Sequence, residues 1–282
     1  MILLLFLKRL RPFNLMLIAL SQYLVFTIFT SFEECTALAL IFSTSILAGS
    51  GNIHNDFCDI LSDKINKKQN FFFANKQKNK FWLFYSISNL SALAIGYLYT
   101  DVFYILLCCS ALLFLYNWKF QKTALFGNLV IAILSAISIY LPIIQTDTRV
   151  TELPSNLQIL LFFLLISCFY LQLFREITKD LMDYKGDYNA DFQTLPILIG
   201  KERTYKIMIV LSSFFVISMV YFLVWFVPKE LIPYSYIILG LLLPTCYLMF
   251  LTLKKKDVLL LRISLVTKIL IGLGILYMTL YL

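Results

Sequence analysis

The sequence predicts an all-α, polytopic membrane protein. Of its 282 residues, 60% are hydrophobic and only 14% are charged, and the mean hydropathy is +0.83. A soluble domain cannot bury so much apolar surface. The apolar residues also form long unbroken runs, whereas the strands of a transmembrane barrel alternate apolar and polar residues in segments of about 10. A bundle of membrane-spanning helices is therefore expected.

Nine apolar runs follow one another along the chain. Each is close to the roughly 20 residues that a helix needs to cross a bilayer. No low-complexity segment or linker separates them, so residues 1–282 are expected to form a single domain. The nine runs cover residues 12–30, 36–53, 81–100, 102–118, 125–144, 157–174, 205–227, 231–253 and 258–282.

The basic residues predict the orientation of these spans. A net charge of +8 would suggest a nucleic-acid partner for a soluble chain, but here the excess is explained by Lys and Arg kept on cytoplasmic loops, and no nucleic acid is expected. With a cytoplasmic N-terminus, 22 of the 24 basic residues fall inside, and only Arg149 and Lys229 fall outside. The long loops 55–80 and 180–204 are then cytoplasmic, and the C-terminus lies on the opposite side.

The six cysteines show no metal-type CxxC spacing and mostly fall within the apolar runs, so small core positions are expected for them and the redox compartment stays open. They are Cys35, Cys58, Cys108, Cys109, Cys168 and Cys246.

An acidic array follows the second span. Asp56, Asp59 and Asp63 are spaced by three and then four residues. On a helix that turns 100° per residue they lie at about 0°, 300° and 340°, which is one face. The only histidine, His54, lies about 160° away from Asp56, so packing or capping is favoured over a role as a base.

The sixth span ends in a second array with the same spacing. Asp180, Asp183 and Asp187 begin 124 residues after the first array. The duplication predicts a pseudo-repeat in which the two arrays face each other. A single array would be interpreted as a solvated helix end, but two matched copies at the membrane edge favour a functional site.

The arrays predict a magnesium site. Like charges stacked on one helix face repel each other unless cations share the site. Mg²⁺ takes oxygen ligands, and one or two carboxylates typically hold it together with substrate phosphate oxygens. A magnesium-diphosphate substrate at the membrane edge is therefore indicated.

Together with further motifs, the two arrays make the whole chain resemble the UbiA-type intramembrane prenyltransferase superfamily. The resemblance rests on five motifs that recur in order along the spans. These are Arg11-Pro12-x-Asn14, Asn55-Asp56-x-x-Asp59-x-x-x-Asp63, Tyr116-x-x-Lys119, Gly127-Asn128 and Asp180-x-x-Asp183-x-x-x-Asp187.

The resemblance implies nine helices around a central cavity, with Mg²⁺ held by both arrays and a prenyl diphosphate whose tail lies in an apolar tunnel. The catalytic residues that it implies are Asp56, Asp59, Asp180 and Asp183. Asp63 and Asp187 complete the metal-binding set.

The same resemblance implies that polar residues around the arrays bind the substrates. Lys119 can also be a topology anchor, and Arg175 and Lys179 can also be inner-leaflet anchors. Because Lys68 replaces a proline of the family pattern, the loop contact to the diphosphate stays open among Lys67, Lys68, Lys76 and Lys78. The substrate-binding residues are Asn14, Asn55, Lys67, Tyr116, Lys119, Arg175 and Lys179.

The acceptor is the least determined part of the prediction. The residues around the second array, Arg175-Glu176-x-x-Lys179-Asp180 and Gly186-Asp187, look most like the geranylgeranylglycerol-phosphate geranylgeranyltransferase branch. That branch alkylates a glycerol hydroxyl of a lipid. Prenylation of an aromatic quinone precursor and a terpene cyclase with the same metals are the alternatives. A transporter is disfavoured, because its acids should be spread through the membrane depth.

Overall fold

The computed structural model describes residues 9–30, 33–66 and 78–281. Within these ranges the chain is helical and forms no strand, apart from an isolated bridge between Thr123 and Gln193. The helices are α2 (Pro12–Phe29), α3 (Glu34–Cys58), α4 (Ile60–Ile65), α5 (Lys78–Tyr99), α6 (Phe103–Trp118), α7 (Phe126–Gln145), α8 (Ser155–Asn189), α9 (Leu195–Ile199), α10 (Lys201–Trp225), α11 (Leu231–Tyr236), α12 (Leu243–Leu253) and α13 (Leu260–Tyr277). The predicted all-α fold is confirmed.

Eight helical segments in the described part of the chain are long and apolar enough to cross a membrane. The ninth predicted span corresponds to α6, which has 16 residues and is also apolar. At 1.5 Å per residue, α6 rises about 24 Å, slightly less than the hydrocarbon core of a bilayer. Each predicted apolar run therefore contains a helix.

Prolines mark several helix boundaries and one irregular turn. Pro12 is the first residue of α2, where its missing N–H would have no helical partner anyway. The predicted span 231–253 is continuous through α11, a π-helical turn (Ile237–Leu242) and α12. Pro244 follows this turn, and its ring removes a backbone donor and crowds the preceding turn, which accounts for the wider helix.

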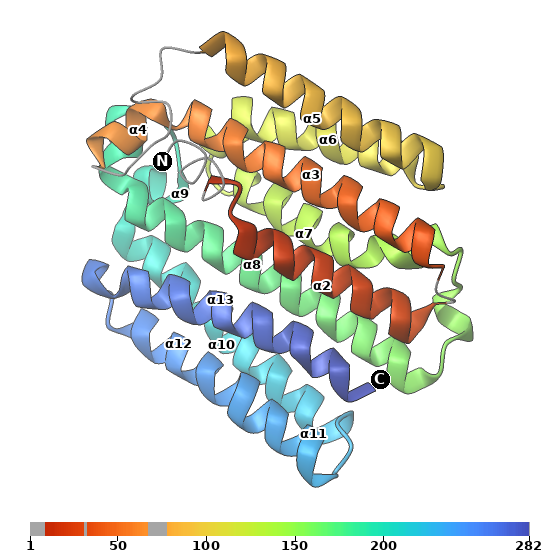
Figure 1. Cartoon of the computed structure of the whole chain (residues 1–282). Coiled ribbons are helices and arrows are strands. Elements are labelled where there is room, and N and C mark those ends of the chain that lie inside the picture. Colours follow the sequence, from red (N-terminus) through yellow and green to blue (C-terminus); the bar gives the residue numbers. More distant parts are fainter. Residues whose placement is uncertain (1–8, 31–32, 67–77, 282) are drawn as a thin grey trace. The chain divides into compact units, whose positions relative to one another are not determined.

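The chain forms two compact units. The first contains residues 1–122, 137–149 and 185–192, and the second contains residues 123–136, 150–184 and 193–282. In the first unit α3 packs against α2, α5 and α6, and it runs alongside α2 and α5 in Figure 1. Its core includes Phe26, Leu40, Leu47 and Leu106, all almost fully buried.

Polar contacts inside the membrane fix the helix register of the first unit. The side chain of Gln22 is fully buried, and its Nε2 donates to the backbone oxygen of Ser138 at 2.9 Å. The hydroxyl of Thr44 donates to Oε1 of Gln22, also at 2.9 Å. Without water in the bilayer core, such bonds favour one arrangement of α2, α3 and α7.

In the second unit α12 packs against α10 and α13. Stacked rings join α8 to α10, with centroids 3.7 Å apart for Phe163 and Phe222 and 4.0 Å apart for Tyr170 and Phe215. At the start of α10, Lys201 pairs with Asp257 of the turn before α13. These contacts join α8, α10 and the turn before α13 into one helical group.

The expected core positions of the cysteines are wrong for half of them. Cys35, Cys108 and Cys246 are exposed, and the other three are partly buried. The reason is that an apolar run in a membrane protein does not imply an interior position, because the outer surface of such a bundle meets lipid rather than water.

Candidate functional site

The first acidic array lies at a break between two helices. α3 ends at Cys58, Asp59 has φ −87° and ψ 7°, and α4 begins at Ile60. The prediction of one continuous helix through this array is therefore wrong at Asp59. Helix-like backbone bonds persist on both sides, from Asp59 N to Asn55 O at 2.9 Å and from Asp63 N to Asp59 O at 2.8 Å. The helical hydrogen bonds therefore continue past Asp59, although the backbone of this residue departs from helical values.

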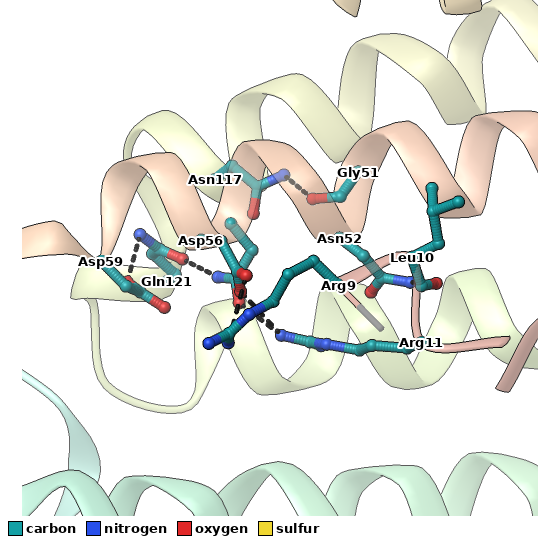
Figure 2. Close-up of polar contacts among 10 residues, drawn as sticks. Arg9, Leu10, Arg11, Gly51, Asn52, Asp56, Asp59, Asn117 and Gln121 are labelled. Carbon is teal, nitrogen blue, oxygen red and sulfur yellow. Dashed lines mark hydrogen bonds and ion pairs between the residues drawn. The ribbon is translucent and has the colours of Figure 1, made fainter. Parts of the chain in front are cut away.

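Two arginines neutralise the first aspartate of this array. Asp56 is buried, and its Oδ2 lies 3.3 Å from Nη1 of Arg9, while its Oδ1 lies 3.7 Å from Nη2 of Arg11 (Figure 2). Asn52 holds this N-terminal segment in place, since its Nδ2 donates to the backbone oxygen of Leu10 at 3.0 Å. A buried carboxylate with paired cations is stable where an isolated one would not be.

The side chain of Gln121 links Asp59 of the first array to Asn55, which directly precedes Asp56. Its Nε2 donates to Oδ1 of Asp59 at 3.1 Å, and its Oε1 accepts from Nδ2 of Asn55 at 2.6 Å. The other end of the Asn55 amide accepts from Nη2 of Arg11 at 3.0 Å. In Figure 2 Gln121 and Asp59 lie beside Asp56, at the end of α3. The amides therefore connect the carboxylates of the array to the arginines.

A third group of contacts joins α4 to the end of α8. The hydroxyl of Ser62 donates to Oδ1 of Asp187 at 2.7 Å, and the backbone N–H of Gly186 donates to Oδ1 of Asn66 at 3.0 Å. Asp63 and Asp187 are both buried. The structure thus brings the last residue of the second array together with α4, which carries the last residue of the first.

The rest of the second array belongs to the second compact unit. Asp180 and Asp183 lie on α8, which continues without a break from Ser155 to Asn189 and so confirms the helical spacing. Nδ2 of Asn128 on α7 donates to Oδ2 of Asp180 at 2.9 Å. Asp183 is buried. The contact by which Asn128 orients Asp180 gives the predicted Gly127-Asn128 motif a physical role.

The donor set of the arrays fits a hard cation. It consists of carboxylate and amide oxygens, which are the ligands that Mg²⁺ takes, and their orientation is fixed by hydrogen bonds from Gln121, Ser62 and Asn128. Within the described residues no three His, Cys, Asp or Glu side chains are grouped closely enough to hold a metal ion by themselves. Mg²⁺ does not require such a group, because it usually keeps several waters and shares its ligands with substrate phosphate.

The other predicted binding residues have varied surroundings. Asn14 is in the first turn of α2, Tyr116 is buried on α6, and Lys119 is exposed at the end of α6. Arg175 on α8 donates to Oε1 of Gln172 at 3.0 Å and lies 3.4 Å from Oε1 of Glu176.

Lys179 is partly buried on α8. Three of the four lysines considered for the loop contact, Lys67, Lys68 and Lys76, lie outside the described residues. The fourth, Lys78, is the first residue of α5.

The packing role of His54 is confirmed. The imidazole is buried among the rings of Phe81, Tyr85, Phe114 and Trp82, with centroids 4.9 to 5.8 Å away. This aromatic group anchors the end of α3 against α5 and α6.

Four residues that contact the arrays are not among the predicted site residues: Arg9, Arg11, Ser62 and Gln121. Arg11 belongs to a family motif and Arg9 to the cytoplasmic basic residues, whereas Ser62 and Gln121 belong to no motif. The two arginines could have been inferred from their positions. They lie just before the first span, and cations at such a position are natural partners for an acidic motif on a neighbouring span. Gln121 gives no such signal, because a glutamine at a helix end usually contacts water.

The sequence model of the UbiA prenyltransferase family matches residues 12–272 of this chain. The chain is 30% identical over 170 residues to a digeranylgeranylglyceryl phosphate synthase of Methanosphaera stadtmanae, an alignment that covers 59% of either protein. It therefore spans less than two thirds of the length of this relative.

Solved structures share the fold along almost the entire chain. A structure of digeranylgeranylglyceryl phosphate synthase in membranes has a TM-score of 0.70 and 21% identity, covering 99% of this chain and 98% of the other. A UbiA homologue from Archaeoglobus fulgidus, bound to DMAPP and Mg²⁺, has a TM-score of 0.66 and 17% identity, covering 97% of this chain and 99% of the other. With a family match over nearly its full length, this chain belongs to the UbiA prenyltransferase family.

Proposed function

We propose that this chain is a magnesium-dependent prenyltransferase that joins the prenyl group of a prenyl diphosphate to the hydroxyl of a glycerol-phosphate-type lipid. The observation that carries the proposal is the first acidic array, a set of buried and partly buried carboxylates that is oriented by an amide and flanked by two arginines. The membership of this chain in the UbiA prenyltransferase family supports the same chemistry. The relative from Methanosphaera, which bears the name of a lipid phosphate synthase, supports the acceptor class.

Mg²⁺ would be held by the aspartates of the two arrays, with Asn55 as a further oxygen ligand. When bound, it supplies Lewis-acid stabilisation of the negative charge that grows on the leaving diphosphate. The homologue structure with DMAPP and Mg²⁺ supports this assignment. The aspartates proposed as ligands are Asp56, Asp59, Asp63, Asp180, Asp183 and Asp187.

The transfer itself breaks one bond and makes one. The allylic C–O bond of the donor breaks, its electron pair stays on the diphosphate oxygen, and the acceptor hydroxyl oxygen forms a new bond to the prenyl carbon. The hydroxyl proton leaves to the diphosphate or to water. Arg9 and Arg11 add positive charge beside the array, where an anionic leaving group is stabilised electrostatically.

The acceptor phosphate is assigned to cations that precede the second array. Arg175 is fixed by Gln172 and Glu176, so its guanidinium is already oriented before a ligand contacts it. Arginine binds phosphate through two parallel N–H bonds, which suits a lipid phosphate headgroup. Lys179, one helical turn later on α8, would add a second positive charge.

We also propose that residues 1–282 form one UbiA-type domain, with the N-terminus and both acidic arrays on the cytoplasmic side and the C-terminus on the opposite side. The asymmetry of Lys and Arg supports this orientation. Cysteine accessibility tests it directly. A cysteine introduced at Lys185 should react with an impermeant maleimide only in inside-out vesicles, in a background without the six native cysteines.

The deciding experiment is a transfer assay with purified protein in lipid. Labelled prenyl diphosphates of several lengths are incubated with Mg²⁺ and with either a prenylglycerol phosphate or an aromatic quinone precursor. A prenyl ether of the glycerol phosphate is the expected product. Prenylation of the aromatic acceptor alone would replace the acceptor assignment, and a cyclic hydrocarbon formed from donor alone would identify a cyclase. Absence of any donor turnover would refute the proposal.

A further inference from the structure

The residue that links the parts of the first array is Gln121, which lies 62 residues after Asp59 in the chain. It belongs to a short 3₁₀ turn (Phe120–Lys122) that follows α6. Its amide donates to Asp59 with the nitrogen and accepts from Asn55 with the oxygen. A single side chain from a different segment therefore contacts both Asp59 of the array and Asn55 beside Asp56.

The direction of these hydrogen bonds is fixed by their charged ends. An ionised carboxylate only accepts and a guanidinium only donates. Asp59 therefore requires the nitrogen of Gln121, which leaves the oxygen of Gln121 to face the nitrogen of Asn55. The oxygen of Asn55 then faces Arg11, as observed. Turning either amide over would place two acceptors or two donors against each other.

The backbone alone does not fix the position of Asp59. This residue lies at the break between α3 and α4, and its own φ and ψ are not those of a regular helix. Its side chain is also only partly buried. A contact from a different segment is what restrains its carboxylate, and Gln121 provides one.

We propose that Gln121 is a positioning residue, which orients the carboxylate of Asp59 and the amide of Asn55 toward the metal and the diphosphate. The inference rests on the proposed function of the array. Of the common side chains of this length, only glutamine offers both the donor for Asp59 and the acceptor for Asn55. Methionine offers neither, and lysine offers only the donor.

The test compares Gln121→Met with a matched control, Gln145→Met. Gln145 also donates to an aspartate, Asp101, at 3.3 Å and accepts from its backbone N–H at 3.1 Å. Gln145 is the last residue of α7 and lies outside both arrays. The control therefore removes a similar pair of hydrogen bonds without touching the proposed site.

Two readouts are needed. The first is the affinity for Mn²⁺, measured by electron paramagnetic resonance with a non-reacting prenyl thiolodiphosphate present. The second is the set of kcat and KM values for donor and acceptor. Partners that orient metal ligands typically contribute about 10- to 100-fold in metal affinity or activity. Gln121→Met should weaken Mn²⁺ binding and lower kcat/KM for the donor by this factor, with an unchanged acceptor KM.

Gln145→Met should change neither readout by more than about twofold, whatever its effect on the melting temperature. The inference is overturned if Gln121→Met behaves like the control, or if it lowers only the melting temperature. A wild-type protein that binds Mn²⁺ but transfers no prenyl group would refute the proposed function and not the role of Gln121.

Discussion

Gly186 on α8 lies in close contact with Ser62 of α4 and with Asn66, and its replacement by alanine gives a stringent test of that contact. A Cβ atom at this position would be 2.5 Å from the backbone oxygen of Ser62 and would also overlap the side-chain amide of Asn66. Real Cβ atoms essentially never come so close to another heavy atom. The backbone oxygen cannot rotate away as a flexible side chain can, so α4 and α8 must move apart.

The expected cost follows from three contributions. Forcing an extra carbon into a packed contact costs about 1–3 kcal/mol. Moving Asn66 breaks the 3.0 Å bond from the N–H of Gly186, which contributes about 1 kcal/mol. Alanine regains about 1 kcal/mol over glycine as a helix former. The net loss in free energy of unfolding is therefore about 2 kcal/mol.

The assay is equilibrium unfolding in mixed micelles, followed by circular dichroism at increasing denaturing detergent. The control is Gly274→Ala in α13, where a Cβ atom meets nothing within 4 Å. This control should gain up to about 1 kcal/mol from helix propensity alone. If Gly186→Ala proves as stable as the wild type, or is stabilised like the control, the close approach of α4 and α8 is refuted.

Three further outcomes concern the proposed activity. Prenyl transfer should stop in excess chelator, return with Mg²⁺ or Mn²⁺, and return poorly with Ca²⁺, whose longer bonds misplace a diphosphate; full turnover in chelator would contradict this. Asp56→Asn and Asp180→Asn should each lower kcat by orders of magnitude without unfolding the protein, whereas Asp191→Asn should have little effect, because asparagine also tolerates the left-handed backbone found there; an equal loss in all three would argue against a defined site. Arg175→Lys should raise the KM for a glycerol-phosphate acceptor and leave the donor KM nearly unchanged in steady-state kinetics, because lysine cannot bind phosphate bidentately; an unchanged acceptor KM would contradict that assignment.

Hydropathy was sufficient to predict the long apolar helices, because each apolar run in this chain reflects a single physical requirement of the bilayer. The ends of the helices were harder to predict. α8 continues to Asn189, although its predicted apolar run ends at Phe174. The added turns are polar and carry the second array, so their helical structure depends on spacing and packing rather than on hydropathy.

The candidate site was predictable only in part. The arrays were found because aspartates repeat at helical spacing, and the contact between Asn128 and Asp180 agrees with a motif noted in the sequence. Gln121 and Ser62 were missed, because their partners are 62 and 125 residues away in the chain. A single polar side chain carries no information about such distant partners.

The two arrays differ in mechanical stiffness, because one interrupts a helix and the other does not. α8 carries Asp180, Asp183 and Asp187 on a single uninterrupted rod, so these three carboxylates can shift only as a group. Asp59 instead lies at the break between α3 and α4, so Asp56 and Asp63 lie on different helices. Any change in the spacing of the first array therefore falls on the backbone of a single residue, whereas the second array has no such break.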